Sequence, residues 1–226
     1  MIQAVVFDLW NTLVFSPGGS PFQRLKTLLR PEQAPLHPEM IRDGMTRPYG
    51  TAAAFLAAWR DRAGLDPAQM AALVEAFQAS SDQADWFPDV PEALQATRGL
   101  ARLALLSNTQ DFSLDLLTRL GVDSRIRLRF LSAELGVLKP EPGAFAAVQR
   151  RLGLFPGNLA MVGDSWSDDV EGALAAGWTA IWVNREGRPR PSHDPDLPLY
   201  EVRALDRVPA LLEGLRAGLR CPTCLG

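Results

Sequence analysis

Residues 4–14, AVVFDLWNTLV, decide how this sequence is interpreted. The first four residues, AVVF, are apolar and partly β-branched, which is typical of a buried parallel strand. Asp8 follows directly, where the apolar run stops. Open α/β sheets bind their ligands at the carboxyl ends of such strands, so Asp8 is a candidate site residue. Taken alone, the stretch is equally consistent with Asp8 capping a turn that Asn11 and Thr12 complete.

Three later segments repeat this pattern: LLSN (105–108), GVLKP (136–140) and MVGDSWSDDV (161–170). Each places a polar or charged group directly after an apolar run. Each also has a structural alternative: a turn for the Ser–Asn pair, a solvated loop for the lysine, and a helix N-cap for the aspartates. Any one of these structural alternatives explains its own segment. Together they do not explain why polar groups recur at the ends of successive strands.

In this order, the four segments resemble the motifs of the haloacid dehalogenase-like hydrolase superfamily, over about two thirds of the chain. The resemblance implies that Asp8 is the catalytic nucleophile, which forms an aspartyl-phosphate. It implies that Ser107 and Asn108 form the second motif and bind substrate. Lys139 would be the third motif, a positive charge that holds both the phosphate and Asp8.

The same resemblance implies a Mg²⁺ cofactor. Its ligands would be the carboxylates of Asp8, Asp164 and Asp169 and the backbone carbonyl of Trp10. Carboxylates are hard oxygen ligands that suit Mg²⁺. Phosphoryl transfer depends on positioning and charge neutralisation, so a cation beside the nucleophile fits that chemistry.

Trp10 departs from the family pattern. Family phosphatases carry a second Asp at this position as the acid/base, whereas an indole N–H can only donate a hydrogen bond. Three functions therefore stay open: a Mg²⁺-dependent phosphatase of a small phosphorylated metabolite, a 2-haloacid dehalogenase, and a catalytically impaired binding protein. The family's dehalogenases place a Tyr here but have lost the acidic pair, which this chain keeps as Asp164 and Asp169. We therefore expect the phosphatase.

The order of predicted elements indicates an α/β fold with a doubly wound, Rossmann-like parallel sheet. Strands are expected at 101–107, 125–131, 158–163 and 178–183, and helices at 90–98, 112–120, 143–152, 170–176 and 205–219. Residues 16–85 show helical spacing for about four helices and no strand signal. The resemblance implies that they form a cap inserted into a core made of residues 1–15 and 86–226. The alternative is an ordinary helical layer of one domain.

Composition bounds the remaining possibilities. The 226 residues carry a net charge of −3, which gives no support for a nucleic-acid surface. No apolar run approaches about 18 residues, so no membrane span is expected. Cys221 and Cys224 are the two cysteines, which favours a reducing cytoplasm, and their C-x-x-C spacing is interpreted as a loose tail. His37 and His193 are expected at the surface. A monomer and a homodimer are both consistent with the sequence.

Overall fold

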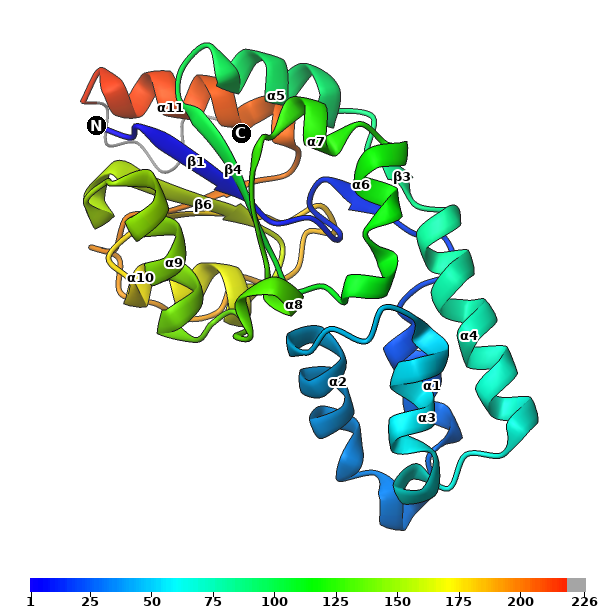
Figure 1. The fold of residues 1–226 in the computed structure, drawn as a ribbon. Helices are drawn as coiled ribbons and strands as arrows, with labels where there is room; N and C mark the ends of the chain where they lie inside the picture. Colours follow the sequence, from blue (N-terminus) through cyan, green and yellow to red (C-terminus); the bar gives the residue numbers. More distant parts are fainter. Residues whose placement is uncertain (219–226) are drawn as a thin grey trace.

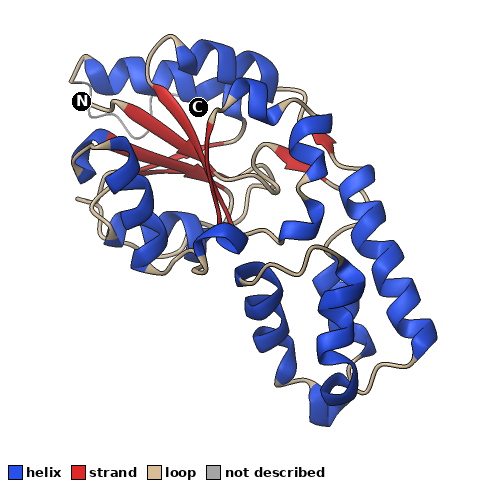
Figure 2. Cartoon of the chain, viewed as in Figure 1, coloured by secondary structure: helices blue, strands red, loops and turns tan. Residues whose placement is uncertain are grey.

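The computed structural model describes residues 1–218, and a six-stranded sheet lies at its centre (Figure 2). All neighbouring strands of this sheet run parallel, which confirms the predicted α/β fold. In sheet order the strands are β5 (Leu128–Leu131), β4 (Arg102–Ser107), β1 (Ala4–Phe7), β6 (Leu159–Gly163), β7 (Thr179–Val183) and β8 (Leu199–Val202).

Strand β1 occupies the middle of the sheet, between β4 and β6. All four of its residues are buried. A strand that is covered on both faces has to be apolar throughout, which explains the AVVF run. The chain extends the sheet outward from β1 in both directions, so the carboxyl end of β1 lies at the switch point where doubly wound sheets bind ligands.

Helices cover both faces of the sheet (Figure 1). Val5 and Phe7 of β1 pack on one face, while Ala4 and Val6 pack on the other. The first face is covered by α5 (Val90–Arg98), α6 (Asp115–Arg119), α7 (Val122–Arg125) and α11 (Val208–Arg216). The second is covered by α9 (Pro142–Leu152) and α10 (Gly172–Ala175), and the short α8 (Ser132–Leu135) follows β5 directly.

Four further helices form a unit beside the carboxyl edge of the sheet, which we call the helical unit (Figure 1). They are α1 (Pro21–Leu28), α2 (Leu36–Thr46), α3 (Ala52–Ala63) and α4 (Pro67–Asp82). The unit has its own core, in which the rings of Phe22, Phe55 and Phe77 pack edge to face at 5.1 to 6.1 Å. Asp66 begins α4 in a capping box with Gln69, as Asp66 before proline predicts.

Two very short strands connect the helical unit to the sheet. β2 (Val14–Phe15) and β3 (Asp85–Trp86) pair antiparallel, so the chain leaves and returns at adjacent points. Two-residue strands carry no recognisable period, so the sequence did not reveal them. His37 was expected at the surface, but it lies in the first turn of α2. It is buried and its Nε2 donates to the carbonyl of Phe22 at 2.8 Å.

Other element boundaries also differ from expectation. The strand expected at 125–131 begins only at Leu128, because residues 122–125 form helix α7. The helix expected at 170–176 is preceded by a π-helical segment, η4 (Trp166–Glu171), which starts at a Ser165 cap. None of the helices within residues 1–218 is both long and apolar enough to cross a bilayer. Cys221 and Cys224 lie outside the described residues.

Candidate active site

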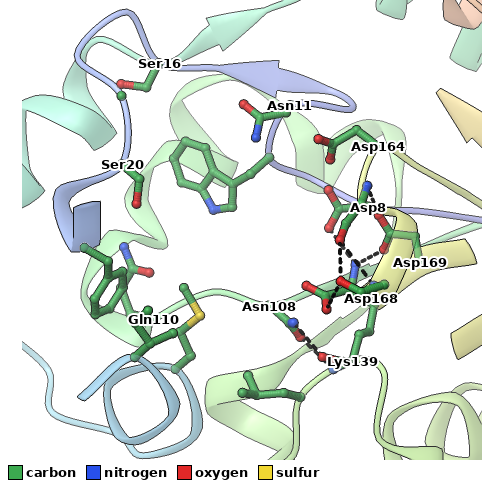
Figure 3. Close-up of a pocket in the computed structure, with 18 of the residues that line it drawn as sticks. Asp8, Asn11, Ser16, Ser20, Asn108, Gln110, Lys139, Asp164, Asp168 and Asp169 are labelled. Atoms are coloured by element: carbon green, nitrogen blue, oxygen red, sulfur yellow. Dashed lines mark hydrogen bonds and ion pairs between the residues drawn. The ribbon is translucent and has the colours of Figure 1, made fainter. Parts of the chain in front are cut away.

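The site is organised around Asp8, the first residue after β1. Its backbone N–H donates to the carbonyl of Val162 at 2.9 Å, which continues the β1–β6 pairing and directs the chain toward the sheet edge. The residue is only 7% exposed and lines a pocket of about 860 Å³ between the sheet edge and the helical unit (Figure 3). The structure therefore places Asp8 where the end of a buried strand predicted it.

Lys139 reaches Asp8 from the loop that follows α8. Its Nζ donates to Oδ1 of Asp8 at 2.7 Å and to Oδ1 of Asp169 at 2.5 Å, and its side chain is almost fully buried. A buried ammonium needs such partners because the loss of hydration is costly. One cation is thus shared between two carboxylates.

Asp164 and Asp169 complete an acidic cluster after β6. With Asp8 they present carboxylate oxygens that all lie within 4.8 Å of one another. Oδ2 of Asp169 accepts a hydrogen bond from the backbone N–H of Ser165 at 3.0 Å. Gly163 makes room for this carboxylate, since a Cβ there would lie 2.1 Å from Oδ2 of Asp169. Three hard oxygen donors at this separation fit a Mg²⁺ ion.

The electrostatics of the cluster favour an added cation. Burial is the largest effect on Asp8 and raises its pKa to about 7, although the positive charge of Lys139 lowers it; the neighbouring Asp169 and Asp164 raise it by smaller amounts. Burial and Asp169 likewise raise the pKa of Asp164 to about 6. Burial by itself lowers the pKa of Lys139, but Asp169 and Asp8 outweigh that effect and raise it. Lys139 therefore stays charged, and its single charge does not neutralise three carboxylates.

Trp10 lines the same pocket, two residues beyond Asp8. Its indole Nε1 donates to Oγ1 of Thr109 at 3.3 Å. The turn that follows requires a left-handed backbone at Asn11, whose φ is 58°. Asn is among the few residues that tolerate this conformation, so the turn signal in the sequence has a structural basis.

The second-motif residues have different surroundings. Ser107 ends β4 and is buried, and its hydroxyl has no hydrogen-bond partner within residues 1–218. An unpaired buried hydroxyl is costly unless a ligand completes it. Asn108 lines the pocket, but its side-chain amide is bonded to the backbone of Lys139. Ser107 itself is not among the pocket-lining residues.

The sequence did not reveal several pocket residues. Arg188, from the loop after β7, donates to the carbonyl of Asp164 at 2.8 Å and lies 4.0 Å from its carboxylate. Asp168 also lines the pocket, beside Asp169. Both aspartates belong to the DSWSDD segment, and the sequence of that segment alone does not show that both line the pocket. Arg185, from the same loop as Arg188, does not line the pocket; it pairs with Asp89 at 3.0 Å and stacks on Phe87.

Comparison with known proteins agrees with this architecture. A family model described as haloacid dehalogenase-like hydrolase matches residues 2–177. The chain is 33% identical to a phosphoserine phosphatase of Thermus thermophilus over 67% of its length, but the match spans only 62% of that relative. It is 29% identical to a glyceraldehyde 3-phosphate phosphatase of Methanopyrus kandleri, over 96% of this chain and 98% of the relative.

Solved structures of both activities share the fold. A 2-haloacid dehalogenase from Pseudomonas syringae pv. Tomato superposes with a TM-score of 0.64 and 26% identity, over 95% of this chain and 100% of that one. An HAD phosphatase from Thermococcus onnurineus gives a TM-score of 0.63 with 23% identity, over 94% of this chain and 99% of that one. Because the family model covers most of the chain, the protein belongs to the haloacid dehalogenase-like hydrolases and is a hydrolase.

Proposed function

We propose that the protein is a Mg²⁺-dependent phosphatase that hydrolyses a small phosphorylated metabolite through an aspartyl-phosphate on Asp8. The observation that carries this proposal is the buried contact of Lys139 with both Asp8 and Asp169, three residues that line the pocket. It brings a nucleophile, a fixed cation and an acidic cluster to one sheet edge. The names of the two phosphatase relatives support the same reaction class.

The residues present fit a Mg²⁺ ion. Asp8, Asp164 and Asp169 supply three converging carboxylates, and burial together with the neighbouring carboxylates raises the pKa of Asp8 and of Asp164. We propose that these carboxylates and the backbone carbonyl of Trp10 hold the ion. When bound, Mg²⁺ would supply the charge that lets a phosphate dianion approach a carboxylate.

In the proposed reaction, an oxygen of Asp8 attacks phosphorus, and the bond between phosphorus and the ester oxygen breaks. The leaving oxygen keeps the electron pair and takes a proton from water. A second water then attacks the acyl phosphate, which releases phosphate and regenerates Asp8. Lys139 offsets the negative charge on the nucleophile and phosphate. The hydroxyl of Ser107 has no partner within residues 1–218 but does not line the pocket, so it would donate to a phosphate oxygen only after the site rearranges on binding.

A 2-haloacid dehalogenase is the second candidate. The aromatic side chain of Trp10 and the likeness to a solved 2-haloacid dehalogenase favour it. The cluster of Asp8, Asp164 and Asp169 argues against it, because without a metal these carboxylates repel a substrate carboxylate. A halide leaves without a proton, so the absence of an acid at residue 10 is consistent with a dehalogenase as well as with a phosphatase that takes the proton from water.

The deciding experiment is a screen of phosphorylated metabolites and short 2-haloacids, with and without Mg²⁺. We expect Mg²⁺-dependent phosphate release that Asp8→Asn abolishes while the circular dichroism spectrum is retained. Fluoroberyllate should occupy Asp8 as a phosphate mimic. Halide release without Mg²⁺ would identify a dehalogenase, and phosphatase activity in Asp8→Asn within about tenfold of the parent would exclude the nucleophile role.

We further propose that residues 16–85 act as a cap on the core formed by residues 1–15 and 86–226. Arg42 of α2 makes a two-pronged contact with Glu141, at 2.7 and 3.2 Å. The backbone N–H of Gly50 donates to Asp111 at 2.6 Å. Arg119 donates to the carbonyls of Ser81 and Ala84, and Phe112 of the core packs on Phe55 and Phe77. The adjacent β2 and β3 connections, at which the chain leaves and re-enters the core, suit a unit that opens and closes.

A further inference from the structure

The charged residues of the pocket lie on one side of it. Six lining residues are charged, four acidic and two basic, and all six belong to the sheet and its loops. Figure 3 shows the aspartates and Lys139 gathered on one side, with Ser16, Ser20 and Gln110 on the other. The opposite wall, formed by the helical unit and its entry, is lined by Ser16, Gly19, Ser20, Pro21, Phe22, Ile41, Met45 and Ser80. Among the lining residues within 1–218, this wall carries no charge.

From this distribution we infer that the organic part of the substrate is uncharged and carries hydroxyl groups. The inference rests on the proposed phosphatase function and adds the chemical class of the substrate. The phosphate has to lie at Asp8 and Lys139, so the organic part extends toward the neutral wall. A carboxylate placed there would lose hydration without gaining a counter-charge, which is unfavourable.

The two cations of the pocket are already engaged. Lys139 is bonded to Asp8 and Asp169. Arg188 donates to the carbonyl of Asp164 at 2.8 Å and packs over the ring of Trp182. Both sit beside the acidic cluster. The pocket therefore has a formal charge of −2, which one Mg²⁺ would offset, and the phosphate then adds negative charge again. A second anionic group on the substrate would meet no remaining positive charge.

The polar groups of the neutral wall suit hydroxyls. The Oγ of Ser16 is buried and has no hydrogen-bond partner within the described residues, although Ser16 lines the pocket. A serine hydroxyl both donates and accepts, so it complements a substrate hydroxyl. Gln110 belongs to the core but lies on the same side of the pocket (Figure 3); it is buried, and its Nε2 donates to Ser113 at 2.8 Å, which orients the amide. Phe22, Ile41 and Met45 provide apolar surface for a carbon chain.

The test compares two phosphate esters with the same two-carbon chain, one ending in a hydroxyl and the other in a carboxylate. p-Nitrophenyl phosphate with Mg²⁺ reports the phosphatase reaction, and 2-hydroxyethyl phosphate and phosphoglycolate are added as competitors. Their inhibition constants can be measured even if either ester turns over slowly. We expect 2-hydroxyethyl phosphate to bind at least about tenfold more tightly, which corresponds to about 1.4 kcal/mol. Equal binding, or tighter binding of phosphoglycolate, overturns the inference.

A positive charge added to the neutral wall should largely remove the preference for the neutral ester. Met45→Arg should improve phosphoglycolate binding by about tenfold relative to the neutral ester, because a buried carboxylate gains a guanidinium partner. Gln78→Arg adds the same charge to an exposed position of α4 that does not line the pocket, and it should leave the ratio unchanged. Failure to hydrolyse p-nitrophenyl phosphate at all would instead overturn the proposed function, and this inference with it.

Discussion

The side chain of Asn108 binds both backbone polar groups of Lys139. Its Oδ1 accepts the N–H of Lys139 at 2.8 Å, and its Nδ2 donates to the carbonyl of Lys139 at 3.0 Å. The ammonium of the same lysine contacts Asp8 and Asp169. Asn108 is predicted to bind substrate and it lines the pocket. From its contacts with Lys139 we propose that it also positions the ammonium.

Replacing Asn108 should therefore affect catalysis and stability together. Asn108→Ala leaves the N–H and carbonyl of Lys139 without their partner, which should cost about 1–3 kcal/mol of unfolding free energy. We expect kcat to fall about 10–100-fold, since small displacements of positioning groups have effects of this size. Chemical denaturation and steady-state kinetics measure both effects.

Asn158→Ala is the matched control, because the Asn158 side chain donates to Met1 at an exposed position far from the pocket. A large rise in KM with an unchanged kcat in Asn108→Ala would instead support direct substrate binding by Asn108.

The sequence predicted those site residues that follow buried strands. Asp8 and Asp164 come directly after apolar runs, so their place at the sheet edge followed from the pattern. The role of Asn108 depends on a partner 31 residues away, and that of Arg188 depends on how the loop after β7 folds back. Hydrophobic periodicity reports which residues are buried, but it does not report which polar groups meet across loops.

The Mg²⁺ site can be tested by calorimetry. Asp164→Asn should weaken Mg²⁺ binding at least about tenfold, because the amide replaces a charged hard ligand. Asp168→Asn is the matched control: Asp168 lines the same pocket and lies in the same segment, but it is outside the three-carboxylate cluster. The affinity of Asp168→Asn for Mg²⁺ should change by less than about threefold. Equal losses in the two variants would contradict the assignment of the metal ligands.

The raised pKa values predict how pH affects stability without metal. The pKa of Asp8 is raised from 3.8 to about 7 and that of Asp164 from 3.8 to about 6, mainly by burial. Between about pH 4 and pH 7 the folded protein binds more protons than the unfolded chain. The two protonated carboxyl groups therefore contribute their full stabilisation of the folded state below about pH 4, and this stabilisation is lost as pH rises toward 7.

Mg²⁺ binds the ionised carboxylates, so its stabilising effect should grow over the same window. Thermal denaturation at pH 5 and pH 8, with and without Mg²⁺, measures it, and we expect the larger rise in Tm at pH 8. Asp8→Asn should reduce the pH dependence without metal. A Mg²⁺ effect that is equal at both pH values would show that the carboxylates do not titrate in this range.

Movement of the helical unit should depend on the contact between Arg42 and Glu141. Arg42→Gln removes the charge from this pair, whose arginine is largely exposed, so stability should change by less than about 1 kcal/mol. We expect faster amide exchange at residues 14–20 and 83–87, and slower exchange there when phosphate and Mg²⁺ are added. Arg62→Gln removes a similar exposed pair, with Glu39, inside the helical unit and is the control. Identical exchange in all three proteins would indicate a rigid layer.

Trp10 should determine which leaving groups the enzyme tolerates. Its indole is bonded to Thr109, and neither group can donate a proton to a departing alkoxide near neutral pH. An aryl phosphate leaves as a much weaker base and needs no such proton. We therefore expect kcat/KM for p-nitrophenyl phosphate to exceed that for simple sugar phosphates by about 10²–10⁴, the usual contribution of general acid catalysis.

Trp10→Asp should restore the missing acid and raise the turnover of sugar phosphates more than that of the aryl ester. Trp10→Asn is the matched control, because it leaves the same void and removes the same contact with Thr109 but supplies no titratable proton. The gain should therefore appear only in Trp10→Asp, and it should decline as pH rises through the pKa of the new carboxyl group. If the parent already hydrolyses sugar phosphates as fast as the aryl ester, a water chain or another residue supplies the proton, and Trp10 does not limit the reaction.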